Sequence, residues 1–517
     1  MSRGCNTLAT GLESLKDPSV GRACPNSVPA GGDTGRIGAS LAEPRQPMLA
    51  PFDTADLIKA QLAARLGETV PLLPLPRREG IASLILELPH TPGAAPALAG
   101  PRFVFAHAQR EELRAGYGIA AEWQAAGADR LRRLRAQAQR LRRQWVLLDP
   151  DETGFEGIAG VGFAATPGAP VHGPGDAACD DLPEALLWVP EVAVCRQAGQ
   201  AALVFSTRLP ADAGELMARW TSWIDRLVPA LCQGRPGPLT PAPLERRWTR
   251  PDRKGWTRAV EVALSAIGQG HVDKVVLSRR LLIRGRRPFD PELLVAALAY
   301  LFPLCQVVML RHGGRCLVAA TPERLLAQRG NLVEVDAIAG TAARASGSDL
   351  DRALGEALLG SAKELREHAI VVQAIRAALG PHSRRVEVPA GPRLLRLNNA
   401  HHLWTPIRAE LEPGWDALAL ADLLHPTPAT NGEPSAAARA WLRRVEPQGR
   451  GWYTGAAGYL NPDLQGELWV LLRCAEIDGD TAILHAGAGI VAGSDPSAEW
   501  DETEHKLAAM LTALQFA

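Results

Sequence analysis

The stretch Ala486-Gly-Ala-Gly-Ile-Val-Ala-Gly-Ser-Asp-Pro-Ser-Ala-Glu-Trp-Asp-Glu-Thr-Glu-His-Lys506 lies near the end of the chain. It predicts the end of a buried strand, a glycine turn and then a helix that Asp495 caps and Pro496 begins. Charged residues three and four apart would share one face of this helix: Glu499, Glu502 and Lys506. Carboxylates and an ammonium beside a turn with free backbone amides indicate a site for a cation and an anion.

The composition is that of a large globular protein without a dominant charge. The 517 residues suffice for one large core or for two or three domains. Lys+Arg and Asp+Glu both count 56, so the net charge is zero. A neutral chain offers no electrostatic basis for binding nucleic acid or an anionic membrane.

Cysteine spacing and hydropathy indicate a cytoplasmic protein. The eight cysteines are scattered without a C-x-x-C pair, which favours reduced buried thiols over a metal or disulfide framework. No run of 18 or more apolar residues occurs, so no membrane span is expected. The N-terminal residues lack the apolar segment of a secretory signal.

Three regions are predicted along the chain. Residues 1–50 are rich in Gly, Pro, Ser and Ala and predict a disordered leader. Short apolar runs over 51–240 predict a strand-rich part that ends in the proline-rich stretch Gly234–Pro243. Residues 245–517 contain the polar clusters and are expected to form the catalytic region.

The segment 120–145 is rich in arginine, with leucines and Trp145 at helical spacing. It could form a polyanion-binding helix around residues 130–143. It could also be a surface helix with an apolar stripe and a solvated basic face. The neutral charge of the whole chain favours the surface helix.

Strand and helix patterns are mixed along the second half rather than strictly alternating. Helices are expected at Trp256–Ile267 and Ser361–Leu379, and strands at Lys274–Arg280 and Leu468–Cys474. A further strand is expected to end at Ala339-Gly-Thr341. This mixture predicts an α+β fold with large antiparallel sheets.

Lys274 and Glu323 are candidates for a base and an acid. Lys274 begins an apolar strand, where it could reach solvent with its ammonium or be partly buried. Partial burial would lower its pKa and let a neutral amine act as a base. Glu323 follows a proline at a strand end and could be the complementary acid, or a plain loop carboxylate.

Glu367 and Glu502 are candidates for metal ligands. Each lies on a predicted helix with a lysine four residues away, a pattern that more often marks solvated ion pairs. If the helices meet, facing carboxylates need a cation, and Mg²⁺ suits one or two protein carboxylates and an anionic substrate. Arg473 lies in an apolar strand, where burial would favour a carboxylate partner.

Read together, ordered motifs over residues 245–515 resemble the chorismate-utilising enzymes. The motifs are KVVLSR, TPERLL, IAGTAAR, SAKELREH, HLWTPI, LHPTPA, RGWYTGAAG, LLRCAEI and AGAGIVAGSDPSAEWDETEHK. The family includes isochorismate synthases, salicylate synthases, anthranilate synthase component I and aminodeoxychorismate synthases. The resemblance implies a two-lobed sandwich of large antiparallel β-sheets surrounded by helices, with residues 51–240 as its variable N-terminal part.

The resemblance also implies residue roles. Lys274 matches the base that activates water for attack on C2 of chorismate, and Glu323 matches the acid that protonates the departing C4 hydroxyl. Glu367 and Glu502 match the Mg²⁺ carboxylates, with Glu499 nearby. The implied substrate-binding residues are Gly340, Thr341, His402, Ala429, Tyr453, Arg473, Gly487 and Lys506.

Within the family the residues favour isochorismate synthase, serving salicylate or catechol siderophores. A base such as Lys274 disfavours the ammonia-using anthranilate synthases, and Ala339 disfavours aminodeoxychorismate synthase. Ala429 stands where salicylate synthases tend to have threonine. Thr430 and Asn431 replace a small or apolar pair, which leaves salicylate synthase, with pyruvate elimination, as an alternative. A decayed, non-catalytic homologue is a third hypothesis, and the chain could be a monomer or a homodimer.

Overall fold

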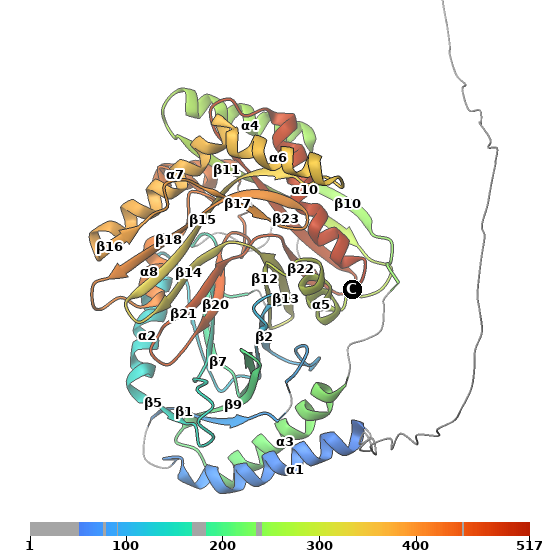
Figure 1. Ribbon diagram of the computed structural model, residues 1–517, viewed down its shortest axis with the longest axis vertical. Helices are drawn as coiled ribbons and strands as arrows, with labels where there is room; N and C mark the ends of the chain where they lie inside the picture. The colour runs from blue at the N-terminus through green and yellow to red at the C-terminus, as the bar shows by residue number, and fades with distance from the viewer. Residues whose placement is uncertain (1–50, 76–78, 90, 168–181, 234–239, 447–448) are drawn as a thin grey trace, which may run out of the picture. The chain divides into compact units, whose positions relative to one another are not determined.

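The computed structural model describes residues 51–75, 79–89, 91–167, 182–233, 240–446 and 449–517. The predicted leader, residues 1–50, lies outside this range. Within the described part, strands form two large sheets, and helices cover both of them (Figure 1). The cysteines of this part are free thiols: Cys195, Cys232, Cys305, Cys316 and Cys474.

The larger sheet has 13 strands among the described residues. In spatial order they are β10 (Glu245–Arg250), β11 (Lys274–Arg284), β23 (Thr481–Ile490), β22 (Cys474–Asp478), β13 (Arg315–Thr321), β12 (Gln306–His312), β2 (Arg102–His107), β3 (Glu112–Tyr117), β8 (Val192–Gln197), β9 (Gln200–Leu209), β1 (Gly80–Glu87) and β5 (Trp145–Leu148), with β19 (Gly432–Glu433) paired to β11. Adjacent strands of this sheet run antiparallel, except that β1 and β5 run parallel to each other.

The smaller sheet has ten described strands, all paired antiparallel. Their order is β16 (Ser383–Glu387), β18 (Ala400–Leu411), β15 (Leu332–Ala343), β14 (Arg324–Arg329), β21 (Gly466–Val470), β20 (Ala456–Leu460), β6 (Ala159–Phe163), β7 (Ala185–Val189) and β4 (Ala121–Ala125), with β17 (Arg393–Arg396) paired to β18. Strands from 51–240 and from 245–517 occur in both sheets, so both parts of the chain build one sandwich.

Helices cover the outer faces of the two sheets. The described helices are α1 (Pro51–Thr69), α2 (Arg130–Gln144), α3 (Ala213–Cys232), α4 (Arg253–Gly268), α5 (Pro291–Leu301), α6 (Ser348–Gly360), α7 (Ala362–Leu379), α8 (Ala417–Leu424), α9 (Ser435–Val445) and α10 (Pro496–Leu514), with 3₁₀ turns at Val70–Leu72 and Gly380–His382. α1 and α3 lie side by side (Figure 1), and α10 contacts β23 of the larger sheet, while α7 contacts β15 of the smaller one.

Separate apolar cores follow from the alternation of side chains along the strands. On β12, Val308 joins a core between the sheets that also contains Phe103, Trp188 and Ala457. Its neighbour Val307 faces the opposite side and joins the core under α1, α3, α5 and α10. The smaller sheet buries its other face against α2, α7 and α8. The fold class predicted from the sequence, an α+β fold with two large antiparallel sheets, is confirmed.

The chain passes from one sheet to the other at two points that carry predicted site residues. β13 and β14 belong to different sheets, and Glu323 lies in the short link between them. β21 and β22 also belong to different sheets, and Arg473 lies in the link 471–473 with φ of 45°. The sandwich therefore brings an acid and a guanidinium to the region where both sheets meet.

Several element boundaries predicted from the sequence are wrong. The expected strand Leu468–Cys474 ends at Val470, because the chain leaves the smaller sheet there. The strand expected to end at Thr341 continues to Ala343, with a bulge at Gly340, whose φ is 82°. The arginine-rich segment becomes a strand at 121–125 and the helix α2.

The glycines of residues 486–493 lie in a strand and a later turn, whereas a turn directly after Ala486 was predicted. β23 runs to Ile490, so Gly487 and Gly489 are strand residues paired with β11 instead of turn residues. The turn comes later and contains Gly493, with φ of 90°. The helix itself begins as predicted, since Asp495 accepts hydrogen bonds from the amides of Ser497 and Ala498.

Candidate active site

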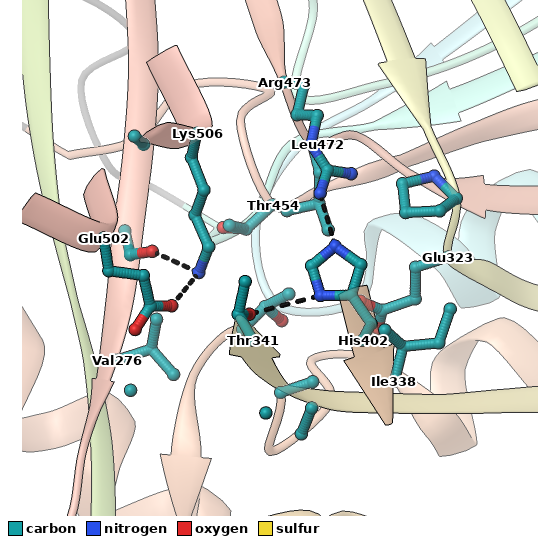
Figure 2. Close-up of a pocket in the computed structure, with 18 of the residues that line it drawn as sticks. Val276, Glu323, Ile338, Thr341, His402, Thr454, Leu472, Arg473, Glu502 and Lys506 are labelled. Atoms are coloured by element: carbon teal, nitrogen blue, oxygen red, sulfur yellow. Dashed lines mark hydrogen bonds and ion pairs between the residues drawn. The ribbon is translucent and has the colours of Figure 1, made fainter. Parts of the chain in front are cut away.

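A pocket lies between β11, β15, β18, β23 and helices α7 and α10 (Figure 2). Its walls carry charged, imidazole and hydroxyl groups together with small residues. The lining residues are Val276, Pro322, Glu323, Ile338, Ala339, Gly340, Thr341, Glu367, His402, Ala429, Thr430, Tyr453, Thr454, Leu472, Arg473, His485, Ala486, Gly487, Gly489, Glu502 and Lys506. All site residues predicted from the sequence line this pocket except Lys274 and Glu499.

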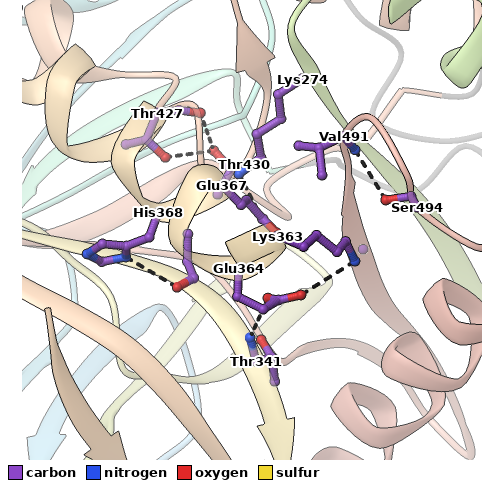
Figure 3. Close-up of polar contacts among 12 residues, drawn as sticks. Lys274, Thr341, Lys363, Glu364, Glu367, His368, Thr427, Thr430, Val491 and Ser494 are labelled. Carbon is purple, nitrogen blue, oxygen red and sulfur yellow. Dashed lines mark hydrogen bonds and ion pairs between the residues drawn. The ribbon is translucent and has the colours of Figure 1, made fainter. Parts of the chain in front are cut away.

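Lys274 lies directly behind the pocket wall and is fully buried, where only partial burial was expected. Its Nζ lies 2.9 Å from Oε1 of Glu367, which lines the pocket (Figure 3). Burial alone would raise the pKa of Glu367, but the ammonium of Lys274 and the more distant Lys506 and Lys363 lower it. The carboxylate of Glu367 is therefore held in its charged form.

Gly489 makes room for this ion pair. A Cβ atom added to Gly489 would lie 2.4 Å from Oε1 of Glu367 and 3.1 Å from Cε of Lys274. Both distances are shorter than ordinary van der Waals contacts. A glycine at this strand position therefore lets the ion pair keep its place without displacement of the Glu367 side chain, a role that the sequence pattern did not reveal because it depends on α7 packing against β23.

Glu502 and Lys506 form a second ion pair on the pocket wall. Nζ of Lys506 lies 2.6 Å from Oε1 of Glu502 and donates a hydrogen bond of 2.9 Å to the carbonyl of Gly487 (Figure 2). The predicted spacing of three and four residues on one helix face is observed. Gly487 thus presents its carbonyl to a lysine, whereas its amide was expected to face a substrate carboxylate.

Glu499 lies next to this wall, buried and paired with a lysine from another helix. Nζ of Lys363 donates a hydrogen bond of 2.8 Å to Oε1 of Glu499. The lysine four residues before Glu367 therefore neutralises Glu499 on α10 and does not form the expected pair within α7. Because Lys363 and Glu499 lie on α7 and α10, their contact joins the two helices that carry the predicted metal carboxylates.

Glu364 is a site residue that the sequence analysis missed. Its Oε2 accepts a hydrogen bond of 3.2 Å from the amide of Thr341. Burial and the nearby carboxylates of Glu367 and Glu502 raise its pKa. Burial and Glu502 likewise raise the pKa of Glu499, against the effect of Lys363. The signal in the sequence was the first glutamate of Lys363-Glu-Leu-Arg-Glu-His368, about one helical turn before Glu367.

His402 and Arg473 form a buried pair on the opposite side of the pocket. Nη2 of Arg473 lies 2.7 Å from Nε2 of His402, and Nδ1 of His402 lies 3.2 Å from Oγ1 of Thr341 (Figure 2). A guanidinium can only donate, so Nε2 accepts and Nδ1 carries the proton that His402 donates to Thr341. Burial and the charge of Arg473 lower the pKa of His402 well below its usual range, so the imidazole is neutral.

Glu323 is the buried acid of the pocket, with 3% of its surface exposed. Its Oε1 accepts a hydrogen bond of 3.4 Å from Oγ1 of Thr427. Desolvation raises the pKa of Glu323 to about 8, although Lys274 and Thr427 act in the opposite direction. The carboxyl is therefore mostly protonated near neutral pH and can donate a proton.

Ala429, Tyr453 and Gly487 shape the part of the pocket without charge. Tyr453 is buried and stacks on His485, with ring centroids 5.1 Å apart. A Cβ atom at Gly487 would lie 2.9 Å from the hydroxyl of Tyr453, so glycine is needed for this approach. His485 is a further lining residue that the sequence analysis did not identify.

The arginines of α2 are partly engaged within the fold. Nε of Arg135 lies 2.7 Å from Oδ2 of Asp416, and Arg142 pairs with Asp463. Arg130 is buried and donates to the carbonyl of Ala164. These contacts favour the surface-helix interpretation over a polyanion-binding helix.

Comparison with known proteins places this pocket in a family. The family described as chorismate binding enzyme matches residues 87–515, which include every residue of the pocket. The chain belongs to the chorismate-binding enzyme family.

Among the described residues, no helix combines the length and the apolar composition that a membrane span requires.

Curated family members and solved structures are similar to the chain. The salicylate biosynthesis isochorismate synthase of Pseudomonas aeruginosa is 40% identical over 51% of this chain and 55% of that protein. Isochorismate synthase MenF of Bacillus subtilis is 38% identical over 51% of this chain and 56% of that protein. These alignments span about half the length of either relative. The structure of the menaquinone-specific isochorismate synthase MenF from Escherichia coli covers 90% of this chain and all of its own, with a TM-score of 0.72 and 27% identity.

Proposed function

We propose that this protein converts chorismate to isochorismate by adding water at C2 and removing the C4 hydroxyl. The observation that carries the proposal is one pocket with a protonated carboxyl, Glu323, on one side and the lysine Lys274 behind the other. An addition with elimination needs such an acid and base at separate points around the substrate. The similarity to proteins named isochorismate synthases supports the same reaction.

In the proposed mechanism, Lys274 gives up its ammonium proton before the reaction and then, as an amine, takes a proton from a water molecule where Glu367 and Gly489 line the pocket. The water oxygen bonds to C2, the ring double bonds shift, and the C4–oxygen bond breaks. Glu323 gives its proton to the departing hydroxyl, which leaves as water. One water enters and one leaves, so the atoms balance. Each turnover leaves Lys274 protonated and Glu323 ionised, and the next cycle requires that Lys274 returns its proton to solvent and that Glu323 regains one.

Substrate carboxylates would be held by the cationic groups of the two walls. Arg473 is buried with its Nε lacking a hydrogen-bond partner among the described residues, so it has capacity for a carboxylate oxygen. Lys506 lies on the other wall beside Gly487. Neutral His402 fixes the guanidinium of Arg473 through Nε2 and leaves its positive charge available to the substrate.

The carboxylates of α7 and α10 are the groups that we propose for binding a magnesium ion. Glu367 and Glu502 line the same pocket, and Glu364 and Glu499 lie next to them. The described residues contain no group of three or more His, Cys, Asp or Glu side chains arranged to hold an ion. Mg²⁺ nevertheless needs only one or two protein carboxylates and takes its other ligands from water and substrate. We propose that Glu367 and Glu502 hold it, with Glu499 close by, and that it supplies positive charge for the substrate carboxylate.

A product assay tests this function. Purified protein with chorismate and Mg²⁺ should form isochorismate without pyruvate, and EDTA should abolish the conversion. Pyruvate released without an added lyase would indicate a salicylate synthase instead. Absence of any chorismate conversion under these conditions would overturn the proposed function.

We further propose that the product serves salicylate or catechol siderophore synthesis. The support is the name of the Pseudomonas aeruginosa relative, which refers to salicylate biosynthesis. Deleting the gene should reduce siderophore secretion under iron limitation, and added salicylate or dihydroxybenzoate should restore it. Normal siderophore secretion in the deletion strain would contradict this destination.

A further inference from the structure

The proposed reaction leaves a proton deficit on a buried group. After each turnover Glu323 has given its proton to the departing hydroxyl and must regain one before the next cycle. Only 3% of its surface is exposed, and this exposed part lines the proposed substrate pocket. A route that reaches Glu323 through hydroxyl groups from a second cavity would give the carboxyl a source of protons besides the substrate pocket.

Two threonine hydroxyls form a chain of contacts that begins at Glu323. Oγ1 of Thr427 donates to Oε1 of Glu323 at 3.4 Å, and it lies 3.2 Å from Oγ1 of Thr430 (Figure 3). Both side chains are buried, with 4% and 2% of their surfaces exposed. The amide of Thr430 donates to the carbonyl of Thr427 at 3.1 Å, which holds the two hydroxyls on one side of a tight turn.

Thr430 also borders a second cavity. This cavity is lined by Ala165, Thr166, Pro167, Pro426, Thr430, Asn431, Arg439, Leu442, Arg443, Glu446, Gly449, Arg450 and Thr454. Thr430 and Thr454 line both this cavity and the substrate pocket. Polar and charged walls of this kind hold water, in contrast to apolar cavities, which stay dry.

We propose that Thr427 and Thr430 form a proton relay that recharges Glu323 from water in the second cavity. Water gives a proton to the hydroxyl oxygen of Thr430 as the proton of Thr430 passes to Oγ1 of Thr427. The original proton of Thr427 passes to Oε1 of Glu323 in the same concerted movement. Each hydroxyl gains one proton and loses one, Glu323 becomes neutral, and the cavity water is left as hydroxide, which exchanges with solvent.

The relay requires only a rotation of one hydroxyl. Oγ1 of Thr430 now donates to the carbonyl of Thr427 at 3.2 Å, which is the same distance as to Oγ1 of Thr427. The hydroxyl proton can therefore turn from one acceptor to the other without movement of heavy atoms. Neither threonine touches a reacting atom in this proposal, so both are positioning residues for the proton.

The test compares single-turnover and steady-state rates of the full-length protein, and it rests on the proposed function. Thr430→Val keeps the side-chain shape and removes the hydroxyl. Its single-turnover rate should fall much less than its steady-state rate, because the resting Glu323 already carries its proton. Its steady-state kcat should fall by about tenfold, with KM little changed, since return of the proton becomes limiting. Thr430→Ser should restore kcat.

A matched control separates the relay from packing. Thr454→Val alters another threonine that borders both cavities, and it should change the two rates in equal proportion if it changes them at all. Equal single-turnover and steady-state effects in Thr430→Val, or no effect on either, would overturn the relay while the proposed function stands. A wild-type protein that converts no chorismate would overturn both.

A second measurement does not depend on turnover. Infrared difference spectra after a pH jump report protonation of the Glu323 carboxyl, and its band is assigned by its loss in Glu323→Gln. Protonation should be slower in Thr430→Val than in the wild type and normal in Thr430→Ser. An unchanged rate in Thr430→Val would show that Glu323 regains its proton by another route.

Discussion

The two walls of the pocket treat charge in opposite ways. On the wall built by β11, α7 and α10, carboxylates are matched with ammonium groups, as in Lys274–Glu367 and Lys506–Glu502. On the wall where the chain passes between the sheets, Glu323 is buried without an ion pair among the described residues, and His402 is neutral. One wall therefore preserves charge, and the other wall favours the uncharged forms of its titratable groups.

The difference between the walls shows that the effect of burial on the pKa of a carboxyl group depends on whether a cation is buried beside it. Burial raises the pKa of a carboxylic acid. At Glu367 the adjacent ammonium of Lys274 outweighs this effect and the pKa falls, whereas at Glu323 the effect of burial prevails and the pKa rises. A cation site and a proton donor can thus share one pocket. The predictions below test this contrast, starting with the largest expected effect.

Removing the charge partner of Glu367 should have the largest effect. Lys274→Ala should lower kcat by about 10³-fold, because a general base contributes roughly 10²–10⁴. It should also cost about 3–5 kcal/mol of unfolding free energy, since Glu367 would remain buried without its partner. Isochorismate formation and urea unfolding measure the two effects.

The exposed lysine Lys254 on α4 provides the control for this substitution. Lys254→Ala should leave both activity and unfolding unchanged. Wild-type activity in Lys274→Ala would refute the assignment of the base.

Replacing the buried acid should have the next largest effect. Glu323→Gln should lower kcat by about 10²-fold because it cannot donate the proton. In the wild type, the rate should fall as the pH rises above about 8, where Glu323 ionises. A pH–rate profile of kcat measures this limb, and an acid limb in place of the alkaline one would contradict the role of Glu323.

Glu323 should also make stability depend on pH. Its pKa is about 8 in the folded protein against an ordinary value of 4.5, so the folded state binds more protons between these values. The stabilising contribution is present below pH about 4.5 and is lost as the pH rises to about 8, by at most about 1.4 kcal/mol per pH unit. Glu323→Gln should flatten this dependence in urea titrations at several pH values.

Changing the guanidinium on the wall that carries Glu323 should have a smaller effect. Arg473→Gln removes a charge-assisted bond to a substrate carboxylate, worth about 1.5–3 kcal/mol, and should raise KM by roughly 10- to 100-fold. It should also raise the pKa of His402, since the charge of Arg473 contributes to lowering it. NMR titration of His402 checks the second effect, and an unchanged pKa would indicate that burial alone keeps the imidazole neutral.

Filling the space of Gly489 should have the smallest effect. Gly489→Ala places a Cβ against Oε1 of Glu367, the end of a flexible side chain that can move aside. We expect about a tenfold loss of kcat/KM from misplacement of Glu367, with little loss of stability. Gly268→Ala, where an added Cβ meets no atom within 4 Å, is the control and should match the wild type.

Local patterns predicted much of the site. The helix cap at Asp495, the spacing of Glu502 and Lys506, and the strand that begins at Lys274 depend on neighbours within a few residues. These features were correct because helix caps and helix hydrogen bonds join residues close in sequence, and the apolar run of a strand is visible in the local sequence. The ordered motifs also identified the family, since they place the same side chains along the chain in the same order.

Non-local contacts account for the errors. Arg473 was expected in a strand because the surrounding residues are apolar, but the chain leaves one sheet at Val470 and joins the other at Cys474. Lys363 was expected beside Glu367, four residues away on the same helix. It pairs with Glu499 because α10 lies next to it. Neither sheet exchange nor helix–helix neighbours leave a periodic signal in the sequence.

The sequence alone determined which chemical groups the protein has and in which order: a lysine, several carboxylates, an arginine and the caps and periodicities that place them on elements. The tertiary structure decided how these groups behave. It placed Lys274 against Glu367 and left Glu323 without a cation of its own, so one carboxylate stays charged while the other stays protonated. The reason is that desolvation and Coulomb interactions depend on distances between elements far apart in the chain, and only the packed sandwich sets those distances.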